Sequence, residues 1–157
     1  MNPFSRLTLA AMLSVLVACA SGPQIKEYAA TGPINATAEV TANDERLLLS
    51  RYANLALFSE VALCEFEYAG SILIDENTTS FALPSNERIL VQLNFIERDT
   101  FFQSFAHNSF DLLLSVKPAS TYEFDLVHGQ DGADYTVTET RFGNKRPAQL
   151  IPLADCN

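Results

Sequence analysis

Apolar and polar residues alternate with a period of two along much of the chain after residue 60. The run 64–68 alternates Cys, Phe and Tyr with two Glu residues, which predicts a strand with one apolar and one acidic face and directs Cys64 toward the core. Further strands are predicted at residues 71–75, 88–97, 110–116, 122–126, 135–140 and 148–153. About seven short strands at spacings of roughly ten residues are typical of all-β domains. The pattern therefore predicts a mainly β fold, a small antiparallel β-sandwich or barrel.

One N-terminal helix is predicted before these strands, at residues 44–58. Asn43 is a suitable N-cap, and two acidic residues follow it in the first turn. Apolar residues then continue at helical spacing: Leu48, Tyr52 and Leu55. A second interpretation is open, since the apolar runs 47–49 and 55–58 also fit buried strands.

Two polar stretches and one aromatic cluster lie between the predicted strands. Residues 117–120 predict a turn, and Asp131-Gly132 is a dipeptide that favours a hairpin turn. A calcium loop is the alternative at Asp131-Gly132, but the acidic-ligand spacing of such a loop is missing. Three phenylalanines precede the strand at 110–116: Phe101, Phe102 and Phe105. We interpret them as core residues, and a ligand pocket is the alternative.

The N-terminus has the organisation of an export signal. Arg6 precedes an apolar run over residues 7–18, which is shorter than the roughly 20 residues of a membrane-spanning helix. The run ends in Leu16-Val17-Ala18-Cys19, which resembles the lipobox of bacterial lipoproteins. Ordinary signal-peptide cleavage near Ala18 or Ala20, with no special role for Cys19, is the alternative.

The lipobox resemblance implies a lipid anchor. Residues 1–18 would be a signal peptide, and Cys19 would carry a diacylglycerol on its sulfur and an acyl chain such as palmitate on its amine. Each buried methylene contributes about 0.8 kcal/mol, so several chains together bind a membrane firmly. Residue 20 is Ala, whereas an Asp there commonly retains proteobacterial lipoproteins in the inner membrane. The resemblance therefore implies an outer-membrane lipoprotein whose domain faces the periplasm.

The chain after Cys19 divides into two parts. Residues 19–42 hold few large apolar side chains and two Gly-Pro pairs, which predicts a flexible tether spanning on the order of 25 to 30 Å. Residues 43–157 are of the length of one domain. We expect a single β-rich periplasmic domain on a lipidated tether.

The net charge limits the partners of this domain. The whole chain has a formal charge of −9, and the leader contributes only the positive charge of Arg6. Nucleic acids and anionic lipid surfaces are recognised by clustered Lys and Arg, so neither is an expected partner. The one basic cluster, formed by Arg141, Lys145 and Arg146, is too small to change this.

The three cysteines divide into one and two. With Cys19 acylated, Cys64 and Cys156 remain in an oxidising compartment, where they are predicted to form a disulfide. The closed loop would stabilise the domain by roughly 4 to 5 kcal/mol. A zinc site is the alternative, but the cysteines lack the spacing of zinc ligands. We predict no metal and no cofactor.

Two Pro-containing segments share a weak pattern. Leu83-Pro84 leads into the apolar run 89–91, and Lys117-Pro118 leads into 122–124. This is similar to the Pro-turn-then-strand units of PEGA-type β-sandwich domains, which are found in many envelope lipoproteins. The Gly that normally follows the Pro is replaced here by Ser85 and Ala119. The resemblance implies a fold class only.

Only two side chains are candidate bases near neutral pH, His107 and His128. His128 lies near Asp125 and Asp131, but the chain has no Gly-x-Ser-x-Gly motif. The sequence therefore predicts a non-catalytic, lipid-anchored envelope module that binds a protein or a glycan. The alternative is a small periplasmic hydrolase that uses His128.

Overall fold

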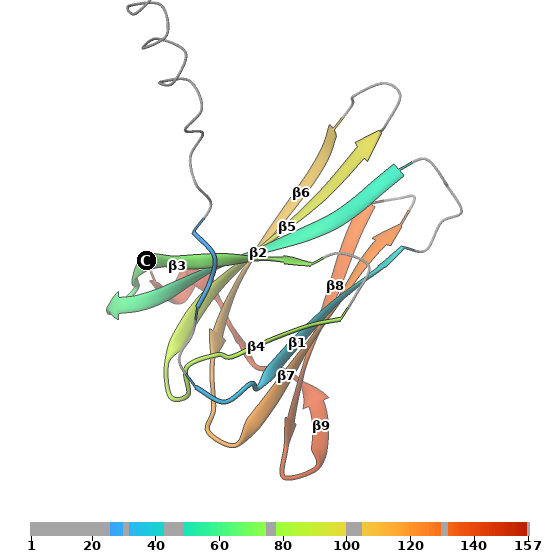
Figure 1. Ribbon diagram of the computed structural model, residues 1–157. Helices are drawn as coiled ribbons and strands as arrows, with labels where there is room; N and C mark the ends of the chain where they lie inside the picture. The colour runs from blue at the N-terminus through green and yellow to red at the C-terminus, as the bar shows by residue number, and fades with distance from the viewer. Residues whose placement is uncertain are drawn as a thin grey trace, which may run out of the picture.

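The computed structural model describes residues 26–29, 32–42, 49–74, 78–99, 105–129 and 132–156. Ten strands in these residues form two five-stranded sheets (Figure 1). The first sheet consists, in spatial order, of β10 (Leu150–Ile151), β6 (Phe105–Ser115), β5 (Arg88–Asp99), β2 (Leu49–Ala62) and β3 (Glu65–Ile74). The second consists of β4 (Thr79–Phe81), β1 (Ala36–Ala42), β7 (Ser120–Gly129), β8 (Gly132–Arg141) and β9 (Asn144–Pro147). A short 3-10 helix, η1 (Leu153–Cys156), follows β10.

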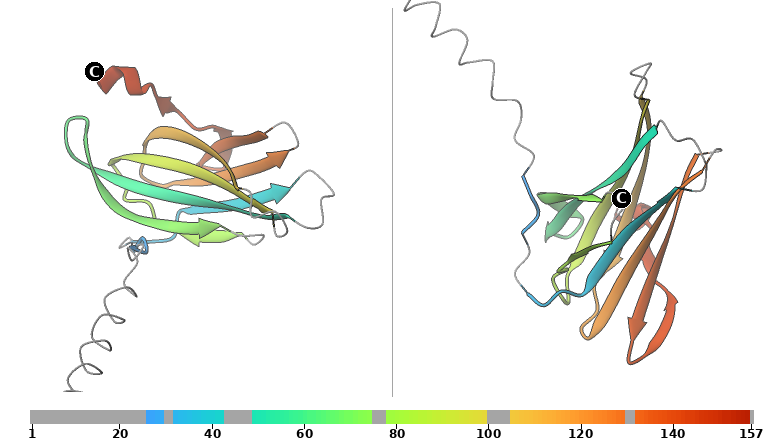
Figure 2. Two further views of the ribbon diagram at one scale, coloured as in Figure 1. Left: turned by 90° about the horizontal axis from the view of Figure 1, so that it is seen from above. Right: turned by 45° about the vertical axis from the view of Figure 1, so that its right-hand side comes forward.

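The core lies between the two sheets, which Figure 2 shows as separate layers. Each strand directs alternate side chains inward, because successive side chains of a strand point to opposite faces. The ring of Phe95 on β5 packs edge-on against His128 on β7, with ring centres 5.3 Å apart. The ring of Phe110 on β6 packs against Tyr135 on β8. These contacts join the two layers, and the mainly β, two-layered prediction is confirmed.

The predicted helix at residues 44–58 is wrong over residues 49–58, which belong to β2. Residues 43–48 lie outside the described part of the chain. β2 lies between β3 and β5 in its sheet, and its alternate residues Ala53, Leu55 and Leu57 are fully buried. Their period of two decides the structure, because β3 and β5 pair with the two edges of this stretch and the other sheet covers one of its faces.

The predicted tether at residues 19–42 is wrong over residues 36–42, which form β1. Ala36, Ala38 and Val40 are buried in the core, so their small size reflects close packing between layers and not flexibility. Asn35 fixes the start of β1, because its side chain donates to the carbonyl of Leu83 (2.9 Å) and accepts from the Leu83 amide (2.6 Å). Residues 1–25, and Cys19 with them, lie outside the described residues.

The strands also differ in number, direction and extent from the prediction. The described residues hold ten strands where about seven were expected. β1 pairs with β7 in parallel, with Ala36 opposite Tyr122, so the fold is not purely antiparallel. The strands predicted at 64–68 and 71–75 are one strand, β3, whose pairing with β2 shifts register between Leu57 and Phe58. The strand predicted at 148–153 is reduced to β10 and η1.

Three further features bear on the sequence predictions. The turn after Pro118 places Ala119 at φ 56, a left-handed conformation that favours glycine. Phe101 and Phe102 lie outside the described residues, and Phe105 begins β6. No helix within the described ranges is long and apolar enough to cross a membrane.

Candidate functional site

The structure joins Cys64 and Cys156 in a disulfide between residues 92 positions apart, with their Cα atoms 5.3 Å apart. Cys64 lies in the tight turn between β2 and β3, at φ 60, and is partly exposed. The expectation that it points into the core from a strand is therefore wrong. Cys156 ends η1, which has no buried residue. The disulfide fixes this C-terminal segment to the β2–β3 hairpin.

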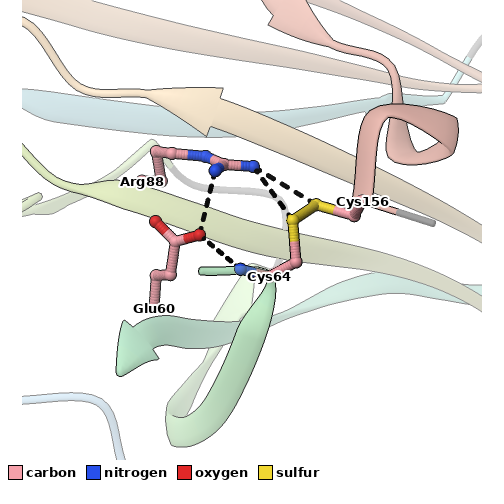
Figure 3. Close-up of a disulfide and its surroundings, with 4 residues drawn as sticks. All are labelled: Glu60, Cys64, Arg88 and Cys156. Carbon is pink, nitrogen blue, oxygen red and sulfur yellow. Dashed lines mark hydrogen bonds and ion pairs between the residues drawn. A yellow bond between two sulfur atoms is a disulfide. The ribbon is translucent and has the colours of Figure 1, made fainter. Parts of the chain in front are cut away.

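An ion pair lies beside the disulfide (Figure 3). Glu60 accepts a hydrogen bond from the backbone amide of Cys64 (2.8 Å) and pairs with Arg88 at 3.0 Å. The Arg88 guanidinium also lies 3.3 Å from the sulfur of Cys156 and 3.8 Å from that of Cys64. The turn is thus held from three sides, by β2, by β5 and by the C-terminus. We call residues 61–64, with this bracing, the hairpin tip.

A groove of about 450 Å³ lies where the edge strand β3 of one sheet approaches the edge strand β4 of the other. The residues lining it come from the N-terminal segment, β2, β3 and β4: Glu27, Tyr28, Asn54, Ser71, Ile72, Leu73, Thr79, Ser80 and Phe81. Among the described residues that line it are three hydroxyl-bearing residues on the two edge strands and one carboxylate, and no Lys or Arg. The groove therefore suits a neutral or basic partner and disfavours an anion.

The N-terminal segment forms one wall of this groove. The Tyr28 amide donates to the Ser71 carbonyl (3.0 Å), and the Ser71 amide donates to the Lys26 carbonyl (2.9 Å). Gly70 makes this approach possible, because a Cβ at that position would lie 2.6 Å from the Cα of Tyr28. Burial, with a smaller contribution from the charge of Glu87, raises the pKa of the Tyr28 phenol, which therefore stays protonated and able to donate.

His128 does not lie in the groove. Its side chain is 3 % exposed on the inner face of β7, where it packs against Phe95 of the other sheet. Asp125 is exposed on the opposite face of the same strand, so the structure does not bring this predicted acid–base pair together. His107 lies in β6, opposite Ile96 of β5. Asp131 lies outside the described residues.

A buried carboxylate occupies the inner face of β8 near one end of the core. Glu139 is 1 % exposed, accepts a hydrogen bond from the Ser120 hydroxyl (2.8 Å) and pairs with Arg146 (3.1 Å) and Lys117 (3.8 Å). Burial raises the pKa of Glu139. The hydrogen bonds from Ser120 and Arg146 and the positive charge of Lys117 lower this pKa by more, so it lies below the ordinary 4.5. Two cations around one buried carboxylate suit a structural role.

The depressed pKa of Glu139 predicts a specific loss of stability in acid. A carboxylate with a lowered folded-state pKa stabilises the protein above the ordinary value of 4.5, and this contribution is lost as the pH falls through the folded-state pKa. The free energy of unfolding in urea should therefore fall more steeply below pH 4.5 for the wild type than for Glu139→Gln, which has no titrating group at this position. Parallel stability curves for the two proteins between neutral pH and pH 3 would contradict this assignment.

The basic cluster predicted from sequence has local partners. Lys145 pairs with Glu123, and Arg146 pairs with Glu139. Arg141 lies at 5.1 Å from the ring centre of the exposed Phe142. Within the described residues no group of three or more His, Cys, Asp or Glu side chains is arranged to hold a metal ion.

Comparisons with protein-family models, with curated proteins and with solved structures find no match for this chain.

Proposed function

We propose that this chain is a lipoprotein of the cell envelope, held in the outer membrane through an acylated Cys19, and that its domain is a non-catalytic binding module. The observation that carries the proposal is that Lys26–Tyr28 pair with the edge of β3 through backbone hydrogen bonds to Ser71. Lys26 lies seven positions after Cys19, and a chain of that length spans at most about 25 Å. An anchor at Cys19 would therefore hold the domain, and the groove beside Tyr28, close to the lipid surface.

The groove supports a binding role. It lies beside β4, the outermost described strand of its sheet, whose outer edge suits an added strand or another polar partner, whereas the N-terminal segment already pairs with β3 at Ser71. Its hydroxyl groups, its carboxylate and the protonated Tyr28 suit a protein segment or a glycan of neutral or basic character. By comparison, the alternative hydrolase would need His128 as an accessible base, and this side chain is buried against Phe95.

Cell fractionation tests the anchor. The wild type should be recovered in the outer-membrane fraction, and Cys19→Ser should accumulate as precursor or as a non-lipidated product, because the thiol that accepts the lipid is gone. Ser21→Ala leaves Leu16 to Cys19 intact and serves as the control that should behave as the wild type. Identical fractionation of the wild type and Cys19→Ser would contradict the proposal.

Site-specific crosslinking in cells tests the groove. A photoreactive residue in place of Ser80, which is exposed and lines the groove, should yield a discrete adduct. The same residue in place of Thr136, which is exposed on β8 and does not line the groove, should not. Equal labelling at the two positions would contradict a binding role for the groove while leaving the anchor unaffected.

A further inference from the structure

The hairpin tip exposes large apolar side chains at the end of a rigid element. Val61 is 60 % exposed and Leu63 is 83 % exposed. Tight turns ordinarily carry Gly, Asn, Asp or Pro, since these residues suit the backbone and tolerate water. Here Leu63 and Cys64 form the turn itself. We infer that the hairpin tip is a second membrane contact, which enters the same lipid surface that the acylated Cys19 occupies.

The tip is braced in an orientation that keeps these side chains outward. The disulfide ties Cys64 to Cys156, and Glu60 accepts from the Cys64 amide while it pairs with Arg88. A flexible loop would fold its apolar side chains back onto the protein, whereas this turn is fixed by covalent and ionic contacts (Figure 3). The bracing also neutralises Glu60, the nearest carboxylate within β2, so it adds no unpaired charge to a surface that meets lipid.

The chain leading to Cys19 leaves the domain beside the same hairpin. The Tyr68 hydroxyl on β3 donates to the Lys26 carbonyl at 3.4 Å. The backbone of Lys26 lies beside Ser71, eight positions from Leu63, so the hairpin extends about 26 Å from there to its tip at the usual rise of a strand. The segment from Lys26 to Cys19 reaches at most about 25 Å, which is a comparable length. The lipid on Cys19 and the hairpin tip can therefore meet one surface. The β8–β9 hairpin, with the exposed Phe142, lies well away from β3 (Figure 1).

The bilayer is the occupant that this arrangement favours. Exposed apolar side chains gain free energy on leaving water, and with an anchor at Cys19 the lipid surface is always within their reach. The exposed Glu65 and Glu67 follow the tip on β3 and repel anionic lipids, so the contact suits a zwitterionic surface. The inference rests on the proposed anchor at Cys19, and it adds that the domain has a fixed orientation on the membrane.

Tryptophan fluorescence tests the inference, because the chain contains no Trp. Leu63→Trp places a single reporter at the tip, and Phe142→Trp, at a side chain that is 79 % exposed on the β8–β9 turn, is the matched control. The acylated full-length mature proteins are reconstituted into phosphatidylcholine vesicles with brominated acyl chains. In these vesicles Leu63→Trp should emit at shorter wavelength than its non-lipidated Cys19→Ser form in buffer, and bromine should quench its emission, whereas Phe142→Trp should show neither effect.

The outcomes separate the inference from the proposed anchor. Acylation of Cys19 is measured by mass spectrometry on the same samples, and an intact disulfide is verified by the absence of thiol labelling. Acylated protein with an unquenched Leu63→Trp overturns the inference alone. Equal quenching at both positions overturns it as well, since the orientation is then not fixed. A shift to shorter wavelength in the non-lipidated Cys19→Ser form of Leu63→Trp without vesicles indicates contact between copies and contradicts it, and an unmodified Cys19 overturns both proposals.

Discussion

Replacing Cys64 and Cys156 together by serine is expected to lower the free energy of unfolding by about 4 kcal/mol. The bond closes a loop between residues 92 positions apart, and opening it restores conformational entropy to the unfolded chain. The folded state also loses the attachment of η1, which buries no residue of its own. Urea unfolding of non-lipidated protein, followed by circular dichroism, measures the difference.

The single variants provide the control for this experiment. Either Cys64→Ser or Cys156→Ser removes the same bond, so each should cost about as much as the double variant and the effects should not add. A loss below about 1 kcal/mol in all three proteins would be at odds with a structural role, because native disulfides that close long loops usually contribute more.

Ala38→Asp is expected to prevent folding or to destabilise the domain by at least about 4 kcal/mol, because it buries a carboxylate without a partner. Ala38 is 1 % exposed, in the middle of β1, between β4 and β7. Thr41→Asp introduces the same group at an exposed position of the same strand and should change the stability little. Circular dichroism with urea unfolding distinguishes the two. Equal stability of the two variants would mean that residues 36–42 behave as a tether after all.

Strands with long apolar side chains were predictable from the sequence. The strand predicted at 88–97 is found as β5, because Ile89, Val91, Leu93 and Phe95 all face the core. β1 was missed because Ala36 and Ala38 provide too little hydrophobic contrast, although their small size is what the close packing requires. β2 was misassigned because its apolar residues fit both the period of a helix and the period of a strand. Only its two neighbours in the sheet decide between these structures.

The candidate site was predictable only in part. The pairing of Cys64 with Cys156 followed from the cysteine count, whereas the bracing by Glu60 and Arg88 depends on a hairpin register that the sequence does not reveal. The groove joins residues far apart in sequence, so no local pattern marks the groove as a whole. Gly70 was the one available signal, since an isolated Gly within a strand indicates close approach of another backbone.

Mass spectrometry of the mature N-terminal peptide tests the central claim most directly. Trypsin cleaves after Lys26, and no Lys or Arg lies between Cys19 and that position, so the peptide of residues 19–26 carries any lipid on Cys19. From membranes of cells that express the wild type, the peptide should begin at Cys19 and carry the mass of a diacylglycerol with or without an additional acyl chain. An unmodified Cys19, or a mature chain that begins at another residue, would contradict the lipoprotein account.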